Sequence, residues 1–130
     1  MVEKIKNNTP FKTEIDDNLY SCYVYTTTYN LGEKLADLTS SFYLVIRKIN
    51  TQKFLGFKYY STEWSYKYDI GYNSLFKKNI SFEYIDGERY YEISDVKSWC
   101  KKAIVDYNKD KKIKEELKYI KKNTIHKSII

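Results

Sequence analysis

The segment from residue 60 to residue 100 constrains the fold most, because turn and cap signals divide it into short pieces. Ser61-Thr62 supplies side-chain oxygens that can cap the first turn of a helix, and Glu63 is favourable near a helix N-terminus. Gly71 can adopt the positive φ of a tight turn and predicts a break after this helix. A second short helix is then predicted over 73–79. The segment therefore opens with two short helices joined by a tight turn.

The second half of the same segment predicts a β-hairpin and a third helix. Ile80–Ile85 and Glu88–Ile93 are β-like runs on either side of Asp86-Gly87, which is a strong signal for a two-residue hairpin turn. Ser94-Asp95 then predicts the start of a helix. Its apolar side chains recur at helical spacing, and they are Val96, Trp99, Cys100, Ala103, Ile104 and Tyr107.

This order resembles the small winged helix-turn-helix domains of the MerR and phage-excisionase type. The turn of that family is similar to Tyr68-Asp69-Ile70-Gly71-Tyr72-Asn73-Ser74-Leu75-Phe76, and its wing and final helix are similar to Asp86–Tyr91 and Ser94–Trp99. The resemblance covers about a third of the chain. It implies an α+β, winged-helix-like protein that binds double-stranded DNA.

The resemblance also implies roles for individual side chains. The second helix would lie in the major groove, the wing would reach the flanking minor groove, and the third helix would contact the backbone. The residues on the second helix are Tyr72, Asn73, Lys77 and Lys78. The wing contributes Arg89, and the third helix contributes Lys97, Lys101 and Lys102.

The first sixty residues predict a strand-rich segment. Leu19–Tyr29 is rich in Tyr, Thr and Val and predicts a strand, and residues 31–38 predict a short helix with leucines on one face. Ser41–Ile49 predicts a strand that pairs through Asn50–Gln52 with Lys53–Tyr60. The alternative is a helix over 42–49, which would make 31–60 a second, degenerate winged unit.

The C-terminal residues predict a separate basic helix. Asn108-Lys109-Asp110 interrupts the apolar pattern, and Ile113, Leu117 and Ile120 then recur at i, i+4 and i+7 over a helix from about 111 to 122. Docking on the domain, a solvated tail, a homodimer or partner helix and a phosphate-contacting arm all fit this pattern. The predicted organisation is therefore 1–60, 61–107 and 108–130.

The charge distribution gives two function classes to compare. The chain carries a net charge of +6 and has a pI near 9.1, which favours a DNA partner. Residues 61–93 hold four basic and six acidic residues, whereas residues 94–130 hold eleven basic and five acidic ones. The acidic balance of the first group favours a protein-binding module, such as an inhibitor of a host nucleic-acid-processing or defence complex.

The remaining inventory argues against enzymes and metal centres. His126 is the single histidine, and Cys22 and Cys100 lack the paired spacing of a zinc site, so we expect no metal, no cofactor and no catalytic centre. The two cysteines are expected to be buried reduced thiols, and a disulfide between them is the alternative. The longest apolar run, Phe42–Ile46, is far below the roughly 20 residues of a membrane span. A cytoplasmic protein without a membrane anchor is the expectation.

Composition adds a guess about the source. Only two alanines occur beside 21 lysines and many Ile, Asn and Tyr residues, which is typical of an AT-rich genome such as that of a low-GC bacterium or its phage. We therefore expect a non-enzymatic DNA-binding regulator or accessory factor of a phage or mobile element. A small protein-binding inhibitor is the alternative.

Overall fold

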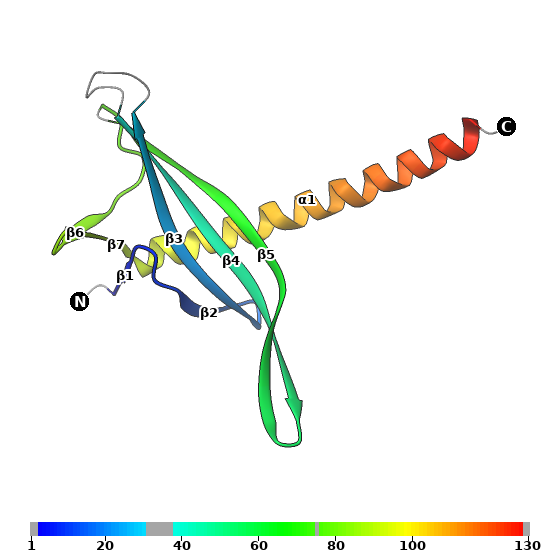
Figure 1. Cartoon of the computed structure of the whole chain (residues 1–130), viewed down its shortest axis with the longest axis horizontal. Helices are drawn as coiled ribbons and strands as arrows, with labels where there is room; N and C mark the ends of the chain where they lie inside the picture. The colour runs from blue at the N-terminus through cyan, green and yellow to red at the C-terminus, as the bar shows by residue number, and fades with distance from the viewer. Residues whose placement is uncertain (1–2, 31–37, 75, 129–130) are drawn as a thin grey trace.

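The computed structural model of the chain describes residues 3–30, 38–74 and 76–128, and it is mostly β (Figure 1). Its elements are β1 (Lys4–Lys6), β2 (Phe11–Ile15), β3 (Asn18–Asn30), β4 (Leu38–Phe54), β5 (Phe57–Ser74), β6 (Glu83–Ile85), β7 (Glu88–Glu92) and α1 (Ile93–Ser128). A four-stranded antiparallel sheet has the order β2-β3-β4-β5, and a three-stranded one has the order β1-β7-β6. The predicted α+β winged helix is therefore wrong.

The core lies between α1 and one face of the four-stranded sheet, which we call the inner face. Buried side chains alternate along β3 and β4, as expected for strands with one covered face. Together with residues from β2, β7, α1 and the segment before β6 they form one cluster: Ile15, Tyr20, Cys22, Val24, Phe42, Leu44, Ile46, Ile80, Tyr91, Val96, Cys100 and Ala103. The N-terminal part of α1 crosses the sheet, and its C-terminal part extends away from it (Figure 1).

The two short helices predicted between residues 61 and 79 are absent from the described residues of this range, 61–74 and 76–79, because most of the segment belongs to β5. Trp64, Tyr66, Tyr68 and Ile70 alternate with polar residues and pack partly against the core. This alternation has the period of a strand, and burial of four large side chains outweighs one local helix cap. Gly71 does have a positive φ, of 144°, but it lies beside a register shift opposite Phe42 rather than in a helix-turn-helix.

Three other predictions about strands are confirmed. The 19–29 strand is present as β3, and Asp86-Gly87 forms the turn between β6 and β7. Ser41–Ile49 is a strand within the β4–β5 hairpin, so the alternative helix over 42–49 is wrong, but its partners are residues 62–72 and not the predicted Lys53–Tyr60. The turn of this hairpin is Leu55-Gly56, however, and not the predicted Asn50–Gln52. The predicted helix over 31–38 falls mainly on residues outside the described ranges.

The C-terminal part of the chain is a single helix. α1 begins at Ile93, with Asp95 in its first turn, and continues without a break to Ser128. The predicted interruption at residues 108–110 is therefore wrong. Asn and Asp reduce helix propensity by only about 0.7 kcal/mol relative to Ala, which is too little to end a helix that is well formed on both sides.

Cys22 of β3 and Cys100 of α1 meet in the core. Both thiols are buried and free, and their sulfur atoms are 3.2 Å apart. The hydrogen bond to Cys100 and burial raise the pKa of the Cys22 thiol far above its usual value. The expected pair of buried reduced thiols therefore also joins the helix to the sheet.

Candidate nucleic-acid interface

The structure places the eight predicted DNA-contacting residues on three separate parts of the fold. Tyr72 and Asn73 lie near the end of β5, and Lys77 and Lys78 follow in the connection to β6. Arg89 is on β7, and Lys97, Lys101 and Lys102 are exposed on α1. The structure therefore has no recognition helix on which the first four residues could lie.

Asn73 has a structural role in this arrangement. It is 9% exposed, and its Oδ1 accepts hydrogen bonds of 2.7 Å from the backbone N–H groups of both Asn79 and Ile80. Its Nδ2 donates a hydrogen bond of 2.9 Å to the carbonyl oxygen of Ile80. The Asn73 amide, which was expected to lie in the major groove, thus holds the connection between β5 and β6. Tyr72, beside it, is 47% exposed.

A different surface combines positive charge with aromatic rings, and it begins with the projecting end of the β4–β5 hairpin. β3 pairs with β4 only as far as Ile49, opposite Leu19, so residues 50–61 continue as a two-stranded ribbon. We call these residues the arm. All residues from 51 to 61 are exposed, and the arm extends beyond the sheet in Figure 1.

The arm has two chemically different faces. Cross-strand partners share a face, and successive pairs alternate between faces. Phe54 pairs with Phe57 and Gln52 with Tyr59, which gives an aromatic face. Lys53 pairs with Lys58 and Thr51 with Tyr60, which gives a cationic face. The large apolar side chains of the arm are strongly exposed: Phe54 64%, Leu55 81%, Phe57 66%, Tyr59 52% and Tyr60 55%.

The lysine pair costs folding stability, because like charges directly opposite each other in a sheet repel. Neither Lys53 nor Lys58 forms an ion pair with a carboxylate in the described part of the chain. Between Asp37 and Glu63 the sequence contains four basic residues and no acidic one. A polyanion bound at this face would neutralise the two ammonium groups, which no described carboxylate does.

The cationic face of the arm continues onto the face of the four-stranded sheet opposite α1, which we call the outer face. Alternation along β4 places Tyr43, Arg47 and Lys53 on the same side. The ammonium of Lys12 lies 4.7 Å from the ring centre of Tyr60, which joins β2 to the arm on this side. The outer face therefore extends over the whole length of the hairpin.

Aromatic rings and lysines also meet at the centre of the outer face. Tyr25 and Tyr43 stack with ring centres 5.2 Å apart, and the Lys67 ammonium lies 4.3 Å from the centre of the Tyr43 ring. A hydrogen bond with Tyr25 raises the pKa of Lys67 above its usual value. The outer face thus offers positive charges for phosphates beside rings that can stack on bases.

The sequence contained a signal for this surface that the helix-turn-helix interpretation did not use. Two lysines stand among aromatic residues in the run Lys53-Phe54-Leu55-Gly56-Phe57-Lys58-Tyr59-Tyr60 of the printed sequence. The sequence around this run lacks acidic residues. What the sequence did not provide was the turn position, and the turn decides which residues face each other. A turn at 50–52 would not have paired Lys53 with Lys58.

The turn of the arm is unusual among the two-residue turns of this fold. Both turn residues have positive φ in each case: Asp16-Asp17 between β2 and β3, Leu55-Gly56 between β4 and β5, and Asp86-Gly87 between β6 and β7. The first residue is Asp in two turns and Leu in the third. Asp tolerates this left-handed conformation, whereas a bulky apolar residue there is strained. Leu55 therefore destabilises the fold, and it is the most exposed of the large apolar side chains of the arm.

The free part of α1 is a second exposed surface. Residues 108–120 are all exposed, and Ile113, Leu117 and Ile120 are 52%, 59% and 58% exposed. More than half of the surface of each of the three side chains in the predicted stripe is therefore exposed. The predicted homodimer through this helix stays a prediction.

The described part of the chain contains no group of three or more His, Cys, Asp or Glu side chains that could hold a metal ion. In that same part of the chain, α1 has no apolar stretch that could span a membrane. Comparisons of the chain with protein-family models, with curated proteins and with solved structures found no match.

Proposed function

We propose that this protein is a non-enzymatic DNA-binding protein that contacts duplex DNA with the outer face and the arm. The observation that carries the proposal is the Lys53–Lys58 cross-strand pair, which lies on an exposed ribbon and has no carboxylate partner. Phosphate neutralisation supplies most of the non-specific affinity of DNA-binding proteins, and these two lysines are free to provide it. A regulator or accessory factor of a phage or mobile element is the role that we propose for such a protein.

The shape of the arm favours a duplex over a single strand. A two-stranded β-ribbon fits a DNA groove, and minor-groove binders often insert apolar side chains at the point of contact. The arm has the size for this role, since five residue pairs extend about 17 Å. Its tip carries Phe54, Leu55 and Phe57, which are the kind of side chain that wedges between base pairs.

The test is a fluorescence anisotropy titration of a labelled random-sequence duplex at several salt concentrations. We expect micromolar binding that weakens steeply with salt. In the Lys53→Ala/Lys58→Ala variant, the plot of log binding constant against log salt concentration should become less steep by about 2. Each lysine that contacts a phosphate contributes about 1 to the magnitude of that slope.

The matched control is Lys97→Ala/Lys101→Ala, which removes the same charge from α1 on the inner side of the sheet. An equal loss of affinity in the control would show that the helix also contacts the DNA. Absence of binding to the wild-type protein at low salt would overturn the proposal.

A protein partner is the second candidate, and the aromatic face of the arm is the observation that favours it. Phe54, Phe57 and Tyr59 gather on one side of the ribbon, where exposed aromatic residues are typical of the centre of a protein interface. In this case the chain would act as a small binding module, such as an inhibitor of a nucleic-acid-processing complex. The Lys53→Ala/Lys58→Ala variant would then keep full function, whereas Phe54→Ala/Phe57→Ala would lose it.

A further inference from the structure

A second site, remote from the arm, is built around Arg89. It is a cavity of about 360 Å³ between the end of β5, the connection to β6 and the β6–β7 hairpin. Two basic side chains, Lys78 and Arg89, lie in its wall together with three serines, and none of its lining residues is acidic. The three serines are Ser40, Ser74 and Ser81.

Arg89 is held in this wall by aromatic rings instead of by a carboxylate. It lies directly opposite Tyr84 in the β6–β7 ladder, and its guanidinium carbon is 5.4 Å from the ring centres of both Phe82 and Tyr84. Its Nε atom is buried and has no hydrogen-bond partner in the described structure. A buried donor without a partner is uncommon in a folded protein, and a shift of the guanidinium that lets an anion or a water reach Nε would satisfy it.

The acidic residues near Arg89 in the sequence are directed elsewhere. Side chains alternate along β7, so those of Glu88 and Glu92 point to the face opposite that of Arg89. On that face β1 provides partners: Lys4 pairs with Glu83, and the Lys6 ammonium lies 3.9 Å from a Glu88 carboxylate oxygen.

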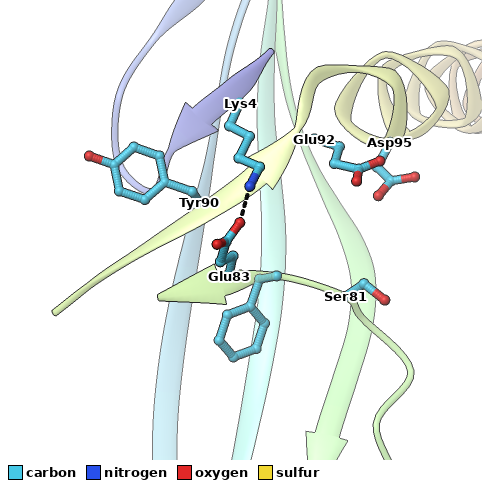
Figure 2. Close-up of a pocket in the computed structure, with 7 residues that line it drawn as sticks. Lys4, Ser81, Glu83, Tyr90, Glu92 and Asp95 are labelled. Atoms are coloured by element: carbon cyan, nitrogen blue, oxygen red, sulfur yellow. Dashed lines mark hydrogen bonds and ion pairs between the residues drawn. The ribbon is translucent and has the colours of Figure 1, made fainter. Parts of the chain in front are cut away.

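Figure 2 shows the opposite side of this sheet, where Lys4 meets Glu83 and the carboxylates of Glu92 and Asp95 lie near each other. The three-stranded sheet therefore separates charge by face. The acids and the lysines of β1 share one side, and Arg89 remains on the other side with Lys78. Neither of these two cations forms an ion pair with a described carboxylate.

We infer that this cavity binds a phosphate group, with the Arg89 guanidinium and the Lys78 ammonium as its cationic ligands. A guanidinium whose Nε and Nη donors lie along one edge matches two phosphate oxygens, a lysine adds a point charge, and serine hydroxyls can donate to the third oxygen. The rings of Phe82 and Tyr84 fix the orientation of the guanidinium, so less conformational freedom is lost on binding. The inference does not depend on the arm.

The chain offers an internal control for the test, because it contains only two arginines, Arg47 and Arg89. Each gives one Nε–H signal in a ¹H–¹⁵N correlation spectrum. We expect inorganic phosphate, titrated against sodium chloride at equal ionic strength, to shift the Arg89 signal saturably, whereas the signal of Arg47, which is exposed and lies outside the cavity, should shift only weakly and without saturation. Lys78→Gln should weaken phosphate binding about tenfold, which corresponds to one charge-assisted contact.

A second arm of the experiment replaces inorganic phosphate with the duplex used for the anisotropy titration. If the duplex shifts the Arg89 signal at concentrations far below those of phosphate, the phosphate comes from nucleic acid. If only inorganic phosphate shifts it, the ligand is a small phosphorylated molecule. Equal shifts with chloride and phosphate, or no shift of the Arg89 signal with either probe, would overturn the inference. If Lys53→Ala/Lys58→Ala loses duplex binding while its phosphate titration is unchanged, the arm and the Arg89 cavity bind their ligands independently.

Discussion

Replacing Leu55 by Asn should make the protein more stable, although it removes a large apolar side chain. Leu55 has a φ of 51° and is 81% exposed, so the substitution relieves backbone strain and loses almost no burial. An L-residue in the left-handed region costs roughly 1–2 kcal/mol, and Asn avoids part of that cost through its local hydrogen bonding. We expect a gain of about 1 kcal/mol in the free energy of unfolding. For 130 residues this corresponds to a rise of about 3–4 °C in Tm.

The assay is urea unfolding followed by Trp fluorescence, with the m-value compared between the variants. The reciprocal control is Asp16→Leu, which places leucine at the equivalent position of the β2–β3 turn, where φ is also 51°. It should destabilise the protein by a similar amount. If Leu55→Asn were neutral or destabilising, the reasoning from backbone strain would be refuted. If it were stabilising and also weakened duplex binding, the leucine would be retained for contact and not for folding.

Two further predictions concern the core and the helix. Oxidation of Cys22 and Cys100 by a diazene oxidant such as diamide should give an intramolecular disulfide, which mass spectrometry detects as a loss of two hydrogen atoms. Closing a loop of this length should stabilise the protein by about 4 kcal/mol. A disulfide that forms without a rise in Tm would contradict the close approach of the two sulfur atoms. The hydroxyl of Tyr66 donates a hydrogen bond of 2.5 Å to Asp106, and this bond raises the pKa of Tyr66 to about 12. Because the folded-state pKa lies above the usual value of 10, the stabilisation is complete below pH 10 and is lost as pH rises towards 12. The difference in Tm between wild type and Tyr66→Phe should therefore shrink over that pH range, and a constant difference would show that the bond does not form.

Local signals in the sequence predicted local structure well. The Asp86-Gly87 turn, the 19–29 strand and the strand over 41–49 depend on neighbouring residues, and each is present. The apolar spacing after Ser94 likewise gave the first part of α1. These elements need only turn chemistry and side-chain periodicity, which the sequence contains directly.

The errors arose where a local signal competed with tertiary packing. Ser61-Thr62 has the chemistry of a helix cap, but the alternating residues from Trp64 to Ile70 bury more surface as a strand than a short helix would. The resemblance to a winged helix reinforced this error, because it used the same short segment. The candidate site was missed for a related reason: its lysines and tyrosines come from β2, β3, β4 and β5, and only the register of the sheet brings them together.

The unbroken course of α1 fixes both the reach and the direction of the C-terminal end of the chain. From Tyr107, which stacks on Trp64, the helix runs 21 further residues to Ser128, or about 30 Å at 1.5 Å per residue. The sheet thus carries a rigid spacer, and anything attached at its far end is held at a set distance from the core. Because each residue also rotates the helix by about 100°, removing seven residues would shorten the spacer and keep its orientation, whereas removing two would turn its end to nearly the opposite side.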